Sequence, residues 1–206
     1  MGTMHAGAAR LKHPADTGGD QLGDAALIER SLCTPECFAR LFDRHGPAIH
    51  SYVARRLGSD AADDLTAEVF LIAFQRRHAY DASYEDARPW LYGIATNLVG
   101  RRRRDEVRLL RAIARSGGHS PEESFAEQVA DRVAAQAVRG RLASALSRLS
   151  RGQRDVLLLT AKGLSGQEIA AAIGVPRGTV ASRLARARRK VRAELEDLNS
   201  SEIRGE

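Results

Sequence analysis

The sequence has few aromatic residues, only two cysteines and no long apolar run. Phe, Trp and Tyr together make up 5% of its 206 residues, and Cys33 and Cys37 lack a second Cys or His pair at the spacing of a zinc site. The longest unbroken apolar run, Val69 to Phe74, is far shorter than the ~18 residues of a membrane span. Residues 1–23 contain no signal-peptide core. We therefore expect a soluble, cytoplasmic protein with reduced thiols, no metal site and no membrane insertion.

Recognisable catalytic patterns are missing as well. The sequence has no glycine-rich phosphate-binding loop, no metal-ligand cluster and no nucleophile with an evident base, and its six histidines are scattered. It predicts a protein that is not an enzyme and that has no catalytic residues, no cofactor and no small-molecule substrate.

What the sequence does contain favours helices and a polyanionic partner. Ala, Leu and Arg are abundant and the six prolines are scattered, which predicts an all-α fold. The net charge is +6 and the pI about 9.9, with the basic excess concentrated in Arg101–Arg115 and Arg177–Arg192. Because arginine binds phosphate and guanine through two parallel hydrogen bonds, these segments indicate nucleic acid.

The stretch from Ser165 to Leu195 is typical of a helix-turn-helix. Ser165 and Glu168 can form a capping box, Gly174 suits the left-handed end of a helix, and Pro176 suits the first position of the next one. The second helix has one apolar stripe, made of Val180, Leu184, Ala187, Val191, Leu195 and Leu198. Its other faces are basic. The pattern favours a helix that enters the major groove over a solvated basic face on an ordinary hairpin.

The segment from Asp60 to Gln75 predicts a helix that is apolar around most of its circumference. Acidic residues crowd its N-terminal end, where the helix dipole stabilises them. Such a helix is either fully buried or covered in part by a partner.

A third informative segment begins at Pro89. Trp90 and Tyr92 lie beside a polar loop and precede the basic run Arg101–Arg104. Aromatic rings stack on unpaired bases while arginines hold the backbone, so this segment suits single-stranded nucleic acid. Core packing explains either ring alone equally well.

These patterns divide the chain into two small helical domains joined by a flexible linker, with the helix-turn-helix in the second. Residues 1–23 are expected to be a disordered tail, residues 24–111 the first domain, and residues 112–130, which contain Ser116-Gly117-Gly118, the linker. The second domain covers residues 131–198 and includes another capping box at Ser150 and Gln153. Residues 199–206 form a short tail.

Taken together, three motifs resemble a bacterial RNA polymerase sigma factor of the extracytoplasmic-function (ECF) type, in the sigma-70 superfamily. They are DDLTAEVFLIAF, RPWLYGIATNLVGRRRR and LSRGQRDVLLLTAKGLSGQEIAAAIGVPRGTVASRLARARRKV, which occur in this order. The match covers roughly residues 25 to 195.

The resemblance implies a dissociable subunit that binds core RNA polymerase and directs initiation at promoters, with an anti-sigma factor as a further partner. Residues 24–111 would correspond to sigma region 2 and residues 131–198 to sigma region 4. The polymerase-binding residues it implies are Asp64, Glu68, Phe70 and Phe74. Those implied for the minus-10 promoter element are Trp90, Tyr92, Asn97, Arg101 and Arg102. Those implied for the minus-35 element are Arg177, Thr179, Ser182, Arg183, Arg186, Arg189 and Lys190.

Some positions depart from the family pattern. Ala67 stands where the family often has Gln, and Ala181 and Ala185 stand where recognition helices often have basic or larger residues, so relatives do not give the minus-35 sequence. A stand-alone LuxR-like helix-turn-helix regulator is the alternative, but it leaves residues 65–74 and 90–104 unexplained. An RNA-binding or ribosome-associated protein fits the charge but not the helix-turn-helix. The regulon, the inducing signal and any inhibitor stay open.

Overall fold

The computed structural model describes residues 22–115 and 144–202, and every regular element in them is a helix. The N-terminal half contains α1 (Asp24–Arg30), the 3-10 helix η1 (Pro35–Phe38), α2 (Ala39–Leu57), α3 (Ala62–Arg76), the 3-10 helix η2 (Arg77–Ala79) and α4 (Arg88–Arg115). The C-terminal half contains α6 (Arg151–Ala161), α7 (Gly166–Ile173) and α8 (Arg177–Glu202). The all-α fold is thus confirmed.

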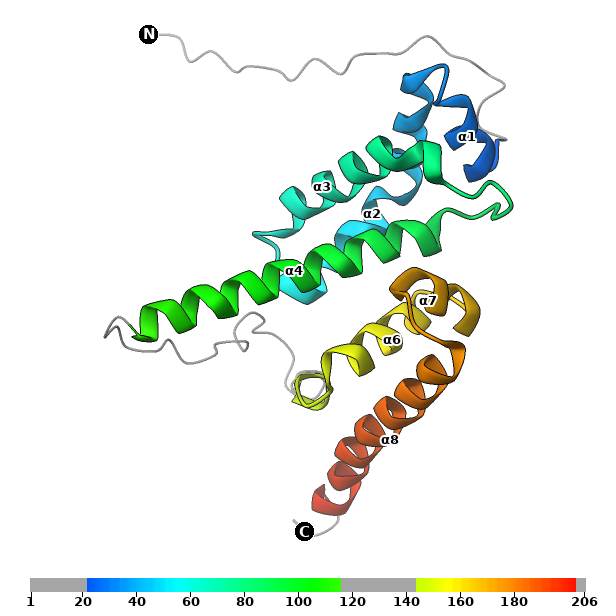
Figure 1. Cartoon of the computed structure of the whole chain (residues 1–206). Helices are drawn as coiled ribbons and strands as arrows, with labels where there is room; N and C mark the ends of the chain where they lie inside the picture. Colours follow the sequence, from blue (N-terminus) through cyan, green and yellow to red (C-terminus); the bar gives the residue numbers. More distant parts are fainter. Residues whose placement is uncertain (1–21, 116–143, 203–206) are drawn as a thin grey trace, which may run out of the picture.

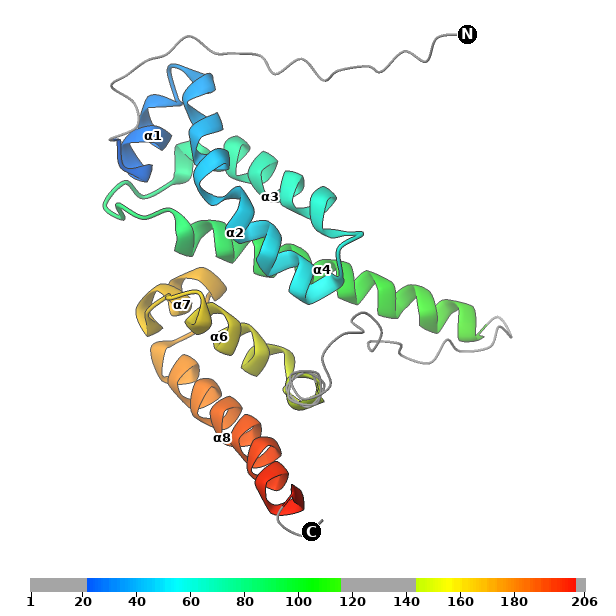
Figure 2. The same ribbon diagram turned by 180° about the vertical axis from the view of Figure 1, so that it is seen from behind.

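The two halves pack against each other through α4 (Figures 1 and 2). Helix α3 lies on one side of α4 and α7 on the other, while the end of α2 reaches α6, where Arg56 pairs with Asp155. Contacts between α4 and α7 are the most extensive between any two elements of the described chain. A single apolar cluster therefore continues from Leu91 in α4 to Ile169 in α7 and Val180 in α8.

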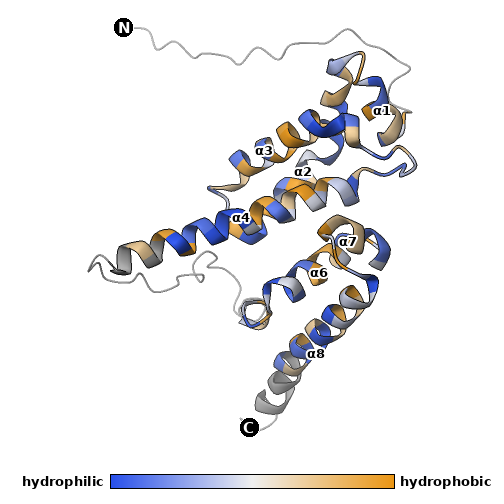
Figure 3. Ribbon diagram, viewed as in Figure 1, coloured by the Kyte–Doolittle hydropathy of each residue, from blue (hydrophilic) through white to orange (hydrophobic). Residues whose placement is uncertain are grey.

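Hydropathy explains why α4 serves as the central helix. Its apolar residues gather in the N-terminal turns, whereas the turns that follow are hydrophilic (Figure 3). Leu91, Ala95 and Val99 are fully buried and belong to the common apolar core. In the basic turns that follow, Arg101, Arg102 and Arg104 are exposed and Arg103 is half-buried.

Both predicted capping boxes and the predicted left-handed helix end in the C-terminal half are confirmed. Ser165 Oγ accepts a hydrogen bond from the Glu168 amide at 3.3 Å, and the Ser165 amide donates to Glu168 Oε2 at 2.6 Å, which completes the capping box. Gly174 ends α7 with φ +66°, the left-handed conformation that suits glycine. Ser150 and Gln153 form the second capping box. Helix α8 begins at Arg177, so Pro176 lies one position earlier than expected.

Part of the predicted domain division falls outside the described residues. The predicted linker begins at residue 112, but residues 112–115 are the last turn of α4. The rest of the linker and the first part of the predicted second domain, residues 131–143, lie in the undescribed range 116–143. Of the two predicted tails, residues 1–21 and 203–206 are not described. Leu22, by contrast, packs against the core.

A buried carboxylate fixes the start of the N-terminal half. Asp24 is 5% exposed and accepts hydrogen bonds from Arg44 Nη1 at 2.6 Å and from the Ala87 amide at 2.9 Å. His45 Nε2 lies 2.6 Å from Asp24 Oδ2, the same oxygen that accepts from the Ala87 amide. One side chain thereby joins α1, α2 and the segment that leads into α4.

We expect this carboxylate to make the stability of the N-terminal half pH-dependent. Burial raises the pKa of Asp24, but hydrogen bonds from His45, the Ala87 amide and Arg44 outweigh burial and lower the pKa from 3.8 to about 2. A group with a lowered pKa stabilises the fold above its unfolded pKa, and this contribution is lost as the pH falls from about 4 to about 2. At ~1.4 kcal/mol per pKa unit, it amounts to about 2 kcal/mol.

Urea unfolding of the wild type and Asp24→Asn at pH 6 and at pH 2.5 measures this contribution. The variant should be less stable at pH 6 by about 2 kcal/mol, and most of the difference should vanish at the lower pH. An equal difference at both pH values would show that the ionised carboxylate is not the cause.

Candidate protein and nucleic-acid interfaces

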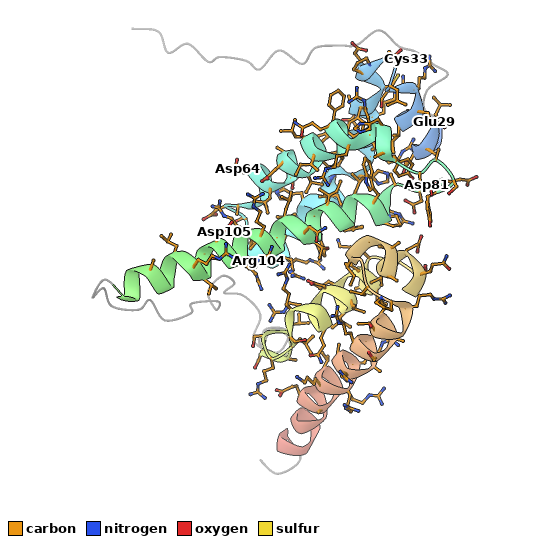
Figure 4. All side chains as sticks on the ribbon, in the orientation of Figure 1. Glu29, Cys33, Asp64, Asp81, Arg104 and Asp105 are labelled. Atoms are coloured by element: carbon orange, nitrogen blue, oxygen red, sulfur yellow. The ribbon has the colours of Figure 1, made fainter. Side chains whose placement is uncertain are left out.

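One exposed face of α3 carries the acidic residues predicted to bind polymerase. Asp64 and Glu68 are exposed, and at 100° per residue they share a face with Leu71, whose exposed fraction is 54%. Figure 4 shows Asp64 near the start of α3, on the far side of α4 from the C-terminal half. We call Asp64, Glu68 and Leu71 the α3 face. It combines two negative charges with an uncovered apolar side chain, which suits a protein partner.

Phe70 and Phe74, also predicted to bind polymerase, lie elsewhere on α3. Phe70 is 6% exposed, and its ring packs edge-on against Phe42 with centroids 4.9 Å apart. Phe74 is partly buried, packs edge-on against Phe38 at 5.4 Å and lies 3.9 Å below the guanidinium carbon of Arg77. These rings attach α3 to η1 and α2, so they support the α3 face from within. The sequence pattern did not single out Leu71 as a site residue.

The predicted minus-10 residues separate into an exposed set and a buried one. Positions 90, 97 and 101 fall on one face of α4, and Asn97 and Arg101 are exposed. Trp90 is partly buried, with its ring centroid 5.0 Å from that of Tyr80 in the preceding segment. We call Trp90, Asn97 and Arg101 the α4 face. It offers an aromatic edge, an amide and a guanidinium in one line.

Tyr92 belongs to the core in this structure. Its side chain is 2% exposed, and its ring packs edge-on against Tyr52 at 5.3 Å. Burial raises the pKa of its phenol. A base cannot stack on this ring without opening the core, so the structure sets Tyr92 apart from the α4 face.

The arginines of the basic run 101–104 also separate into exposed side chains and one that turns inward. Arg101, Arg102 and Arg104 are exposed, with Arg102 about 100° around the helix from Arg101. Arg103 turns inward, and its Nη2 donates to the Arg56 carbonyl at 2.5 Å. Burial, followed by the charge of Arg56, lowers the pKa of Arg103. Its neighbours remain available to phosphates.

Helix α8 presents an outward face suited to DNA. Ser182, Arg186 and Arg189 are exposed and share that face. Arg177 is exposed near the first turn, and Thr179 beside it is half-buried. In the first part of the predicted apolar stripe, Val180 and Ala187 are buried and Leu184 and Val191 are half-buried.

Arg183 and Lys190 lie at the margin of α8 and contact the C-terminal half itself. The guanidinium of Arg183 lies against Gly152 in α6, where an added Cβ would come within 2.9 Å of its Cζ. Lys190 Nζ is 3.5 Å from the Arg148 carbonyl. Both side chains therefore reach the edge of this outward face rather than its centre.

Neither the cysteines nor any other donor group suggests a metal centre in the described part. Cys33 is exposed and Cys37 half-buried, and both are free thiols. Within residues 22–115 and 144–202, no three His, Cys, Asp or Glu side chains are grouped as a metal ion requires. None of the described helices has the length and apolar character needed to cross a bilayer.

Comparison with known proteins identifies the family of this chain. Residues 41–109 match Sigma-70 region 2, and residues 139–191 match Sigma-70, region 4. The ECF RNA polymerase sigma factor SigL of Mycobacterium tuberculosis is 33% identical over 182 residues, covering 86% of this chain and 97% of SigL. The chain belongs to the ECF family of RNA polymerase sigma factors.

Further relatives of this sigma factor support the assignment. The RNA polymerase sigma factor CnrH of Cupriavidus metallidurans is 33% identical over 177 residues, or 77% of this chain and 86% of CnrH. The structure of CnrH in complex with the cytosolic domain of CnrY superposes with a TM-score of 0.59 at 29% identity, covering 84% of this chain and 97% of that one. The sigma factor RpoE from Bartonella quintana, solved in complex with the anti-sigma factor NepR, shares the fold at a TM-score of 0.60, with 23% identity and coverage of 77% and 96%.

The predicted resemblance to ECF sigma factors is thus confirmed, and the LuxR-like alternative is not favoured. A stand-alone helix-turn-helix regulator has no counterpart of region 2, which here matches most of the N-terminal half.

Proposed function

We propose that this ECF sigma factor binds core RNA polymerase through the α3 face and directs it to two-part promoters. The observation that carries the proposal is that region 2 and region 4 occur in one chain, each with an exposed face of charged or polar side chains. On this proposal the protein works in the cytoplasm, by binding alone, and catalyses no reaction of its own.

In the N-terminal half, Asp64 and Glu68 supply charge and Leu71 supplies apolar contact to polymerase. The buried rings of Phe70 and Phe74 hold this face in place. On α4, Trp90 and Asn97 contact unpaired bases of the minus-10 element, while Arg101 and Arg102 hold the phosphates of the same strand. Tyr92 acts through packing, because its ring supports α4 from inside the core.

In the C-terminal half, α8 lies in the major groove of the minus-35 element. Ser182 and Arg186 contact base edges, and Arg189 contacts phosphate, because the two former lie nearer the N-terminal end that recognition helices direct at bases. Arg177 and Thr179 flank this surface at the start of the helix. Arg183 and Lys190, at its margin, reach the phosphate backbone.

We also propose an anti-sigma factor as a partner. CnrH and RpoE, which resemble this chain in fold, were each solved with a bound partner protein, CnrY and the anti-sigma factor NepR respectively. A partner that covers the α3 face would compete directly with polymerase.

Co-elution with purified core RNA polymerase on gel filtration tests the proposed function. The wild type should co-elute with polymerase, and the assembled complex should bind promoter DNA that neither component binds alone. Specific DNA binding by the free chain, together with no association with polymerase, would instead indicate a regulator.

A further inference from the structure

Helix α1 and the residue after it hold both ends of the segment that leads from α3 into α4. At one end, Arg77 Nε donates to the carbonyl of Ser31, the residue that follows α1, at 3.3 Å. At the other end, the Ala87 amide donates to the Asp24 carboxylate at 2.9 Å. We call residues 80–87 the η2–α4 segment, which runs beside α1 in Figures 1 and 2. Both flanks of this segment are therefore anchored to the start of the N-terminal half.

The bond to Asp24 acts on the first turn of α4. The first amides of a helix have no partner within the helix itself. Here Asp24 accepts from the Ala87 amide, Asp86 Oδ1 accepts from the Arg88 amide at 2.8 Å, and Pro89 has no amide hydrogen to donate. Of the two acceptors, Asp24 alone belongs to another helix. It therefore fixes where α4 begins relative to α1 and α2.

Trp90 of the α4 face lies three residues after Ala87 and packs against the η2–α4 segment. Its ring centroid is 5.0 Å from that of Tyr80, whose hydroxyl donates to the Tyr84 carbonyl at 2.5 Å. Burial, followed by the negative charge of Asp24, raises the pKa of Tyr80 to about 12, so its phenol stays protonated as a donor. Because Tyr80 is held in this way, a displacement of Ala87 moves Trp90 relative to its neighbour.

The chemistry at position 24 suits positioning better than simple packing. A well-packed apolar side chain often stabilises a contact between helices as well as a buried ion pair does. An apolar side chain at position 24 would, however, leave the Ala87 amide without its acceptor, and Ala87 is fully buried. A carboxylate in α1 therefore does what an apolar residue cannot, because it binds the backbone at the start of α4.

We propose that Asp24 is a positioning residue for recognition of the minus-10 element: by holding the Ala87 amide, it sets the place at which Trp90 meets an unpaired base. This inference rests on the function proposed above for the α4 face. Asp24 is 5% exposed and acts through Ala87 and the first turn of α4 rather than by touching DNA. Recognition of the minus-10 element thus depends on α1, which contributes no residue to the α4 face.

Two substitutions of Asp24 should break the bond to α4 by different routes. In Asp24→Asn, the positive charge of Arg44 attracts the amide oxygen, so the NH2 group of the new side chain faces the Ala87 amide, which is also a donor. Asp24→Glu keeps the charge, but its additional methylene group displaces the carboxylate from Ala87. Circular dichroism identifies conditions under which each variant is folded.

Two control variants separate the bond to Ala87 from other effects. Arg44→Met removes the partner of Asp24 Oδ1 and leaves the bond from the Ala87 amide to Oδ2 in place. Val69→Ala deletes buried methyl groups from α3, so it lowers the stability of the same half without changing a partner of Asp24. Both controls should keep the wild-type position of Trp90.

Two measurements test the proposal. The chain contains one tryptophan, so the intrinsic tryptophan fluorescence of the free full-length chain reports on Trp90. In both Asp24 variants, the emission should shift to longer wavelength and acrylamide should quench it more strongly, because Trp90 loses contact with Tyr80. The complex with core polymerase should bind a single-stranded minus-10 oligonucleotide, taken from a promoter found by run-off transcription, at least about fivefold more weakly, since base stacking depends on where the ring lies.

The same complexes should bind polymerase and the minus-35 duplex as the wild type does, and both controls should resemble the wild type in every measurement. Either an unchanged Trp90 emission or an unchanged oligonucleotide affinity in both folded Asp24 variants would overturn the proposal, as would equal losses in the controls. If the wild-type complex does not bind the oligonucleotide, the proposed function of the α4 face fails, whereas the fluorescence of the free chain still decides whether Asp24 positions Trp90.

Discussion

Replacing Asp64 and Glu68 together by lysine is expected to lower the affinity for core RNA polymerase at least about tenfold, the loss expected when charge complementarity at an interface is reversed. Both side chains are exposed on α3, so the change alters a surface and leaves the core intact. The helical circular-dichroism signal and the melting temperature should stay close to those of the wild type. Fluorescence titration with labelled polymerase gives the affinity.

A control with the same change in net charge separates the α3 face from a general charge effect. Glu29 and Glu36 are exposed acidic residues in α1 and η1, and Glu29 lies far from Asp64 in Figure 4. The Glu29→Lys, Glu36→Lys double variant should bind polymerase like the wild type. Native affinity in the folded Asp64, Glu68 variant, or equal loss in both variants, would remove the α3 face from the interface.

The second large effect is expected on DNA recognition, when arginines of α8 are replaced by alanine. Arg186→Ala should lower discrimination between the preferred minus-35 sequence and a mismatched one by about 1–3 kcal/mol, because a bidentate contact to a base edge is lost. Arg192→Ala, further along the exposed side of the helix, should instead weaken binding to all sequences alike. It should also lower by about one the magnitude of the slope of log binding constant against log salt concentration. Anisotropy of the assembled complex on matched and mismatched DNA at several salt concentrations measures both quantities.

Arg183→Ala serves as a comparison for Arg186→Ala within the same helix. Its guanidinium packs against Gly152, so its loss should affect affinity more than discrimination. A marked change of sequence preference with Arg192→Ala, and none with Arg186→Ala, would reverse the assignment of base and phosphate contacts.

Local features of the fold were predictable because their causes are local. The Ser165 and Glu168 capping box and the left-handed Gly174 depend on residues within one helical turn of each other, and the structure places them as expected. The exposure of Asp64 and Glu68 likewise follows from acidic residues on a helix otherwise rich in apolar ones.

Features that depend on distant partners were not predictable from the sequence. Trp90 and Tyr92 could not be told apart, because Tyr92 is buried by Tyr52, forty positions earlier. Arg56 resembles any other arginine of a basic protein, yet it is buried beside Asp155, which belongs to the other half of the chain. Burial of Phe70 depends in the same way on Phe42, which leaves Leu71 as the apolar member of the α3 face.

Run-off transcription on pooled genomic fragments, with purified core polymerase and with or without this protein, tests the central claim most directly. We expect transcripts that depend on the added protein, whose start sites share two upstream sequence elements, and we expect the Asp64, Glu68 double variant to yield far fewer of them at limiting protein concentration. Transcripts unchanged by the protein, while the free chain binds a specific duplex by itself, would contradict its assignment as a promoter-recognition subunit of RNA polymerase.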